Sequence, residues 1–324
     1  PPFDDPLVIA GNGTIAMEII NQCPDEPDLA FIPVGGGGLI AGMALYLKHC
    51  YPKIKIIGVE PEDSPTLYKA MEANKPVELD WVGIFADGVA VKRIGNEPFR
   101  IIKDLIDEIV LVKTDEICSA IKDIFDDRRV VVEPAGALSV AGAKKYLDSK
   151  SCNDKVVLSI ACGANINFDR LKYISERADL GQTKEALFAV SIPEKPGSFK
   201  EFCRLLGKRS ITEFNYRYAD NQKAQVFAGI ELKDGVLEKH SLMDTIQSNG
   251  FDVVDLSDNE VAKLHLRHMV GGKPAKDLCE KVIRFQFPER PGALMEFLNS
   301  INSDWNISLF HYRNHGSAYG RVLV

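Results

Sequence analysis

The chain has 324 residues, of which 45% are hydrophobic and 26% are charged, so it is long enough to bury the cores of two domains. Its net charge of -7 and its isoelectric point near 5.5 exclude the basic surface that binding to a phosphate backbone requires, and we expect no nucleic-acid partner. No apolar run reaches the roughly 18 to 20 residues of a membrane span, so we expect no membrane partner.

The seven cysteines are scattered and never form a Cys-x-x-Cys pair, which is typical of a reducing compartment. The chain starts with Pro1-Pro2-Phe3 and lacks both an initiator methionine and a signal-peptide pattern. We therefore expect this sequence to be a fragment of a longer protein.

The first half of the chain alternates between short apolar runs and amphipathic stretches. The apolar runs, which we expect to be strands, cover residues 30–34, 54–60, 109–112 and 156–161. The amphipathic stretches, which we expect to be helices, include residues 39–48, 98–107, 116–125 and 137–147. Strands that are apolar at every position and separated by helices indicate a parallel sheet covered on both faces, so the predicted class is α/β.

The second half contains a repeat. A Pro193-Glu-x-Pro-Gly197 turn returns 95 residues later as Pro288-Glu-x-Pro-Gly292, and each turn stands between an apolar run and a helical pattern. A second match, offset by 96, indicates a duplicated α+β module of strands and helices. The predicted domains are residues 1–180, a first module at 181–276, and a second, truncated module at 277–324.

Four glycines and a leucine follow the first expected strand and open a helix: Gly35, Gly36, Gly37, Gly38 and Leu39. Free N–H groups at a helix start can hold a phosphate, and glycines let the backbone approach it closely. The spacing of Gly36, Gly38 and Ala41, with Glu60 at the end of the next strand, also fits a dinucleotide fingerprint. A flexible glycine loop is the third interpretation, and this motif alone does not choose among them.

Two further segments place polar groups beside expected strands and helices. Glu133 stands in Val132-Glu-Pro-Ala-Gly-Ala137, and Cys162 stands in Cys162-Gly-Ala-Asn-Ile-Asn-Phe168 after the fourth strand. Each segment alone is more often a capped turn than a site. Together with the glycine loop they predict a ligand site at the carboxyl edge of the sheet.

These motifs, with Phe85-Ala-Asp-Gly-Val-Ala-Val-Lys92 between them, occur in an order that resembles the threonine dehydratases of isoleucine biosynthesis. That family has the fold-type II, tryptophan synthase β-like fold and uses pyridoxal 5'-phosphate. The resemblance extends from residue 1 to 324, and the duplicated tail is similar to the paired ACT-like regulatory modules of those enzymes. It disfavours a dinucleotide-dependent oxidoreductase.

The resemblance implies roles for the site residues. The segment Gly35 to Leu39 would hold the cofactor phosphate, Cys162 would face the pyridine nitrogen, and Glu133 would play a supporting catalytic role. The family's Schiff-base lysine lies in a Ser-x-Lys-x-Arg-Gly type motif, which this sequence does not contain. We therefore expect the chain alone to be inactive.

The implied reaction converts L-threonine to 2-oxobutanoate and ammonia, the first committed step of isoleucine biosynthesis. The resemblance also implies inhibition by isoleucine, opposing action by valine and a homotetramer. The implied allosteric residues follow the two turns: Glu194, Gly197, Phe199, Tyr216, Glu289, Gly292 and Tyr312.

Several alternatives stay open. Serine racemases bind a divalent cation near the position of Glu60, but Thr66 stands here in place of one aspartate ligand, so we predict no metal. The chain could instead be a non-catalytic amino-acid-binding regulator, or another fold-type II lyase or racemase. We expect it in the bacterial cytoplasm, or in a plastid if it comes from a plant.

Overall fold

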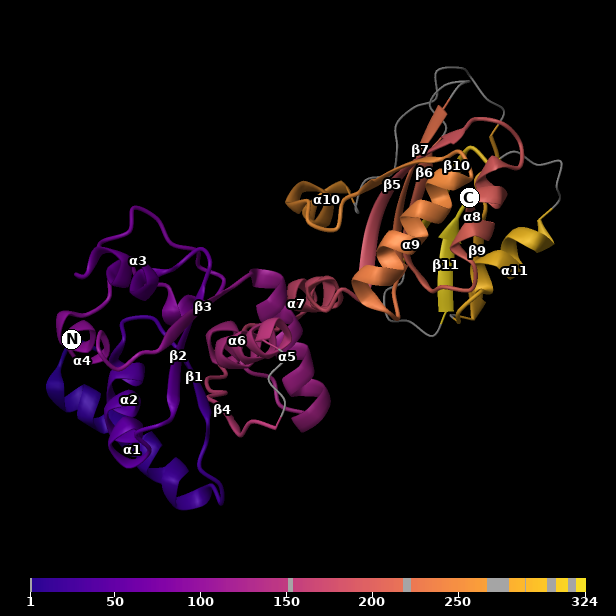
Figure 1. Cartoon of the computed structure of the whole chain (residues 1–324). Helices are drawn as coiled ribbons and strands as arrows, with labels where there is room; N and C mark the ends of the chain where they lie inside the picture. The colour runs from indigo at the N-terminus through magenta and orange to yellow at the C-terminus, as the bar shows by residue number, and fades with distance from the viewer. Residues whose placement is uncertain are drawn as a thin grey trace. The chain divides into compact units, whose positions relative to one another are not determined.

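The computed structural model describes residues 2–150, 154–217, 223–266, 280–288, 290–301, 307–313 and 319–324. It forms two compact units, Pro1–Gly181 and Gln182–Val324 (Figure 1). Within the described residues, no helix is both long and apolar enough to cross a membrane.

Unit 1 is built on a four-stranded parallel sheet in the order β3-β2-β1-β4. Its strands are β1 (Leu29–Pro33), β2 (Lys55–Pro61), β3 (Glu108–Val112) and β4 (Val157–Ser159). Its helices are α1 (Pro6–Gln22), α2 (Gly38–Cys50), α3 (Thr66–Ala73), η1 (Asp87–Val89), α4 (Asn96–Ile102), α5 (Thr114–Arg128), α6 (Pro134–Lys150) and α7 (Phe168–Gly181). The structure confirms the predicted parallel α/β fold.

Both faces of this sheet are buried. Phe31 and Val59 belong to an apolar cluster shared with α5, α6 and α7, whereas Ile32 and Ile56 belong to a second cluster shared with α1 and α2. Neighbouring residues of one strand therefore serve opposite cores, as strand geometry requires. This explains why the strands are apolar at every position.

Two predicted elements are shorter than expected. The helix predicted at 98–107 ends at Ile102, and the Asp107 carboxylate accepts bonds from the Ile56 amide at 2.7 Å and Lys48 Nζ at 2.8 Å. The strand predicted at 156–161 ends at Ser159, because the chain turns toward α6, where the Cys162 amide donates to the Gly136 carbonyl at 3.3 Å. Both elements therefore end where the chain forms hydrogen bonds with neighbouring elements.

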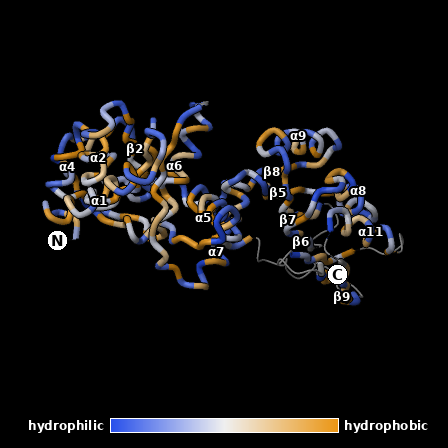
Figure 2. Tube along the Cα trace, turned by 90° about the horizontal axis from the view of Figure 1, so that it is seen from below, coloured by the Kyte–Doolittle hydropathy of each residue, from blue (hydrophilic) through white to orange (hydrophobic). Residues whose placement is uncertain are grey.

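Unit 2 holds a seven-stranded antiparallel sheet in the order β8-β5-β7-β6-β10-β11-β9. The first copy contains β5 (Glu185–Pro193), α8 (Ser198–Leu206), β6 (Ile211–Arg217), β7 (Lys223–Glu231), α9 (Gly235–Ser248), β8 (Asp252–Asp255) and α10 (Glu260–Leu264). The second contains β9 (Arg284–Pro288), α11 (Ala293–Ser300), β10 (Leu309–Arg313) and β11 (Tyr319–Leu323). Figure 2 shows hydrophobic and hydrophilic residues alternating along α8 and α9.

The two copies join through β6 and β10, which occupy the same place in each copy. Phe214 pairs with Tyr312, which is the counterpart of Tyr216 in the second copy. Tyr216 in turn pairs with Phe310, the counterpart of Phe214. Asn215 pairs with its own counterpart, His311, which marks the centre of a local twofold arrangement. The copies share one apolar core, although the predicted division between residues 276 and 277 lies outside the described residues.

Candidate functional site

The glycine loop links β1 to α2 at the carboxyl edge of the sheet. Gly37 is the N-cap of α2 and has a φ of +89°, a conformation that favours glycine. A Cβ at Gly35 would lie 2.8 Å from the Cα of Val89, and one at Gly36 would lie 2.2 Å from the Phe3 ring. The loop therefore depends on the absence of side chains.

This loop fits an anionic phosphate group. The first N–H groups of a helix have no intrahelical acceptor, and the helix dipole makes this end positive. Gly37 contributes no side-chain capping bond to α2. Backbone donors at a glycine-lined helix start are the donor set that a phosphate needs.

Glu60 is fully buried at the end of β2 and caps α3. Its carboxylate accepts bonds from the amides of Leu67 at 2.7 Å and Tyr68 at 2.9 Å, and from the Thr66 hydroxyl at 3.1 Å. Burial raises the pKa of Glu60 to about 7, against the lowering effect of these bonds. The enclosed carboxyl is already engaged and is not placed to meet a ribose, which argues against the dinucleotide interpretation.

Thr66 ties this buried carboxyl to the glycine loop, because its hydroxyl also lies 3.2 Å from the Gly35 carbonyl oxygen. Thr66 therefore acts as a brace for the loop rather than as a cation ligand. No group of three or more His, Cys, Asp or Glu side chains that could hold a metal occurs in the part of the chain that the structure describes.

Glu133 and the Cys162 segment form the other half of the site, beside β4 and the start of α6. The Glu133 amide donates to the Gly163 carbonyl at 3.1 Å, and the Asn165 amide donates to the Glu133 carboxylate at 2.9 Å. A Cβ at Gly136 would lie only 1.4 Å from the Cys162 carbonyl oxygen. The two motifs thus meet through backbone contacts that only glycine permits.

The Cys162 side chain is exposed, but it stands beside this carboxylate. Partial desolvation and the charge of Glu133 raise the pKa of the Cys162 thiol above its usual value. The thiol therefore stays protonated and neutral near pH 7.

The turn η1 connects the two halves. Val89 packs against Gly35, as shown by the 2.8 Å approach above, and a Cβ at Gly88 would lie 2.9 Å from Oε1 of Glu133. The loop that carries Phe85-Ala-Asp-Gly therefore touches both the glycine loop and Glu133. The sequence motif drew attention to this loop but did not predict these contacts.

In unit 2, four of the predicted allosteric residues lie together in the first copy. The Tyr216 hydroxyl donates to the Glu194 carboxylate, and both carboxylate oxygens lie 2.8 Å from it. The centroid of the Phe199 ring lies 5.5 Å from that of Tyr216 and 5.0 Å from that of Phe310 in the second copy. Gly197 is the N-cap of α8 with a φ of +92°, and a Cβ there would meet nothing within 4 Å.

The second copy repeats only part of this arrangement. Gly292 is the N-cap of α11 with a φ of +86°, and Tyr312 is buried with its ring 6.3 Å from that of Phe287. The position of Phe199 is taken by Leu294. Glu289 lies outside the described residues.

Ser198, which the sequence did not single out, distinguishes the two copies. Its side chain is 2% exposed at the start of α8, and its Oγ has no hydrogen-bond partner among the described residues. A buried hydroxyl without a partner carries a free-energy cost. Ala293 stands at the corresponding place in the second copy.

Comparison with known proteins matches two families to different parts of the chain. Residues 1–163 match the family described as pyridoxal-phosphate dependent enzymes, and residues 176–266 and 271–324 match the C-terminal regulatory domain of threonine dehydratase. The chain is 53% identical over its full length to the biosynthetic L-threonine dehydratase of Escherichia coli and 48% identical to the mitochondrial threonine dehydratase of Saccharomyces cerevisiae. It spans 63% and 58% of the length of these relatives.

A solved structure, the processed form of threonine deaminase isoform 2 from Solanum lycopersicum, aligns with 55% of this chain and 52% of its own. The TM-score is 0.54 at 44% sequence identity. The glycine-lined helix start described above lies in the part of the chain that matches the family of pyridoxal-phosphate dependent enzymes. The chain belongs to the family of pyridoxal-phosphate dependent enzymes.

Proposed function

We propose that this chain is part of a threonine dehydratase, a threonine ammonia-lyase that converts L-threonine to 2-oxobutanoate and ammonia in isoleucine biosynthesis. The observation that carries the proposal is one edge of the sheet where the η1 turn contacts both the glycine loop and Glu133, and Glu133 in turn contacts the Cys162 segment. The relatives that match the whole chain bear this activity in their names. These relatives are longer than this chain, so the activity has to be tested on the complete protein.

In this proposal, the backbone from Gly35 to Leu39 holds the cofactor phosphate. Bound pyridoxal phosphate supplies an electron sink that eases loss of the amino-acid α-proton. The neutral thiol of Cys162 would face the pyridine nitrogen and would add no charge there. Glu133 orients this side of the site through its bond with the Asn165 amide.

The experiment measures 2-oxobutanoate released from threonine by the complete protein and by this chain alone, each with pyridoxal phosphate. We expect activity from the complete protein and none from the chain, whose sequence lacks the Ser-x-Lys-x-Arg-Gly motif. If the complete protein binds isoleucine but leaves threonine unchanged, the proposed enzyme activity is wrong and the protein is an amino-acid-binding regulator instead.

We also propose that isoleucine inhibits the enzyme from the first copy in unit 2, with valine opposing it. Three features support this placement: the buried Ser198 hydroxyl, which has no hydrogen-bond partner among the described residues, the Tyr216–Glu194 pair and the open space beside Gly197. The second copy has an alanine in place of Ser198, so we place the tighter site in the first. We further propose a homotetramer located in the bacterial cytoplasm, or in a plastid for a plant protein.

Titration calorimetry with isoleucine tests this placement. Ser198→Ala removes one hydrogen-bonding group and is expected to weaken isoleucine binding about tenfold, which corresponds to roughly 1.4 kcal/mol. Ser191→Ala, on β5 and bonded to Gln225 at 3.0 Å, is the control and should bind as the unmodified chain does. Equal affinities for all three proteins would contradict the placement.

A further inference from the structure

The loop at residues 85–89 has little structure of its own. It contains one turn of 3-10 helix, closed by the Val89 amide on the Ala86 carbonyl at 3.0 Å and the Ala90 amide on the Asp87 carbonyl at 3.1 Å. Such a short turn is a weak element by itself. Because it touches both Gly35 and Glu133, its position affects both halves of the site.

Helix α7 holds this loop from the outside. Arg170 Nη1 donates to the Phe85 carbonyl at 3.2 Å and lies 3.7 Å from the Asp87 carboxylate. One turn further along, the Tyr173 ring contacts the Phe85 ring at 5.5 Å. A single guanidinium thus contacts both ends of the segment from Phe85 to Asp87.

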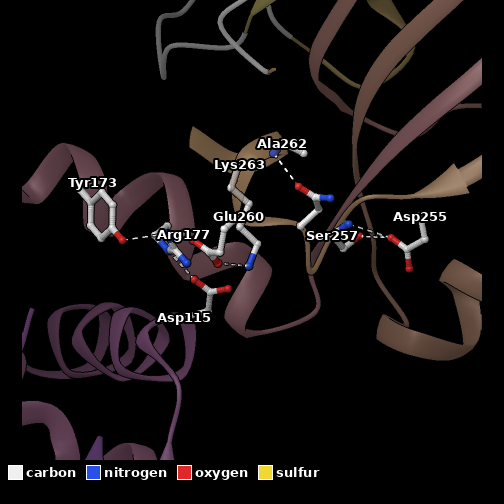
Figure 3. Close-up of polar contacts among 9 residues, drawn as sticks. Asp115, Tyr173, Arg177, Asp255, Ser257, Glu260, Ala262 and Lys263 are labelled. Carbon is white, nitrogen blue, oxygen red and sulfur yellow. Dashed lines mark hydrogen bonds and ion pairs between the residues drawn. The ribbon is translucent and has the colours of Figure 1, made fainter. Parts of the chain in front are cut away.

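Helix α7 is itself fixed to α5 by a deeply buried ion pair, drawn in Figure 3. Arg177, which is 5% exposed, donates to Asp115 at 2.5 Å and to the Tyr173 hydroxyl at 2.8 Å. At the end of α7, a Cβ on Gly181 would lie 2.0 Å from the Asp115 carbonyl oxygen. Arg170 therefore acts from a helix with little freedom to move.

We propose that Arg170 is a positioning residue that holds the 85–89 loop against the glycine loop and Glu133, and so sets the affinity of the site for pyridoxal phosphate. The part concerning the cofactor rests on the proposed function. Arg170 is a positioning residue rather than a catalytic one, because the polar contacts of its side chain, within the part of the chain that the structure describes, are with this loop. The Arg170 and Asp87 side chains are 32% and 46% exposed, so the pair is solvent-screened and the bond to the Phe85 carbonyl carries much of the effect.

Hydrogen exchange of the 86–90 amides in Arg170→Ala tests the positioning role. We expect exchange about ten times faster than in the unmodified chain, because the loop loses its outer support. Lys172→Ala, an exposed change of one positive charge on the same helix, is the matched control and should leave exchange unchanged. Arg170→Lys keeps the positive charge but lacks the planar guanidinium group, so it should restore the slow exchange of the unmodified chain only in part.

Equilibrium dialysis of pyridoxal phosphate against the complete protein carrying the same substitutions gives the second readout. Arg170→Ala should bind about tenfold more weakly than Lys172→Ala. Unchanged exchange of the 86–90 amides in Arg170→Ala would overturn the positioning role, and faster exchange with equal cofactor affinity would overturn its link to the site. Absence of pyridoxal phosphate binding by the unmodified complete protein would instead refute the proposed function, while the exchange result would still decide the positioning role.

Discussion

Glycine serves the two units of the molecule in different ways. In unit 1, Gly136 and Gly163 leave room for other protein atoms: an added Cβ would lie 1.4 Å from the Cys162 carbonyl oxygen and 2.4 Å from the Glu133 carboxyl carbon. In unit 2, Gly197 and Gly292 have positive φ angles, and an added Cβ would meet nothing within 4 Å. The first pair is required by lack of space, to which the φ of +77° at Gly163 adds a conformational requirement, and the second pair is required by backbone conformation alone.

This difference indicates two kinds of site. The loops of the candidate site in unit 1 contact one another closely, because Gly136 lies against the Cys162 carbonyl and Gly163 lies against the Glu133 carboxyl group. The turns in unit 2 are shaped by φ and leave space beside them, which suits a loop that closes on a small ligand. Substitutions that add one carbon atom should therefore have unequal effects in the two units.

The largest effect is expected from Gly136→Ala. The new methyl group would overlap the Cys162 carbonyl oxygen, and because that oxygen belongs to the backbone it can move only if the Cys162 segment shifts. We expect a loss of about 3 kcal/mol or more in the free energy of unfolding of unit 1, at the upper end of overpacking effects. Urea unfolding followed by circular dichroism measures it.

Gly11→Ala is the matched control. Gly11 lies in α1, where an added Cβ meets nothing within 4 Å, so the substitution should stabilise the helix by about 0.5 to 1 kcal/mol. If both variants unfold at the same urea concentration, the contact between α6 and the Cys162 segment is not as tight as described.

A second test uses pH to compare two carboxylates that both accept two backbone N–H bonds. Glu60 in unit 1 is buried and has a pKa raised to about 7, so the folded state binds the extra proton. The stability of unit 1 should then fall by about 3 kcal/mol as pH rises from about 4.5 to 7, at roughly 1.4 kcal/mol per pKa unit. Glu60→Gln should lack this decrease in the same urea measurement.

Glu238 in unit 2 should change the stability with pH in the opposite direction. The amides of Asp234 and Lys233, together with Arg209, lower its pKa. The contribution of Glu238 to stability is therefore present above its unfolded pKa and is lost as pH falls through the folded pKa.

The Glu60 prediction is contradicted if the difference in unfolding free energy between the unmodified chain and Glu60→Gln stays constant from pH 4.5 to 7.5. That result would show that the Glu60 carboxyl is not desolvated.

The smallest effect is expected from Gly197→Ala and Gly292→Ala. A left-handed conformation costs an alanine about 1 to 2 kcal/mol, and no steric overlap is added. Both variants should lose this amount in thermal or urea unfolding. A loss at either position as large as that of Gly136→Ala would mean that the space beside the turn is filled, and the contrast between the units would fail.

Sequence patterns predicted the fold because it depends on periodicity. The four parallel strands and the repeated strand–helix–strand order were found within a few residues of their observed ends. The glycine loop, Glu133 and Cys162 stood out because each belongs to a short motif. Arg170 and Ser198 carry no such signal. Arg170 donates to a loop carbonyl 85 residues away in the sequence, and Ser198 stands out through a buried hydroxyl that has no hydrogen-bond partner among the described residues.

The pairing of β6 with β10 also has a consequence for synthesis of the chain. Phe214 and its counterpart Phe310 are 96 residues apart, so β6 leaves the ribosome well before the strand that completes its edge. At about 5 to 20 residues per second, this interval is roughly 5 to 20 s. During that time β6 is an unpaired edge that can bind another nascent chain, so slow translation of residues 218–309 should favour aggregation or exchange of strands between chains.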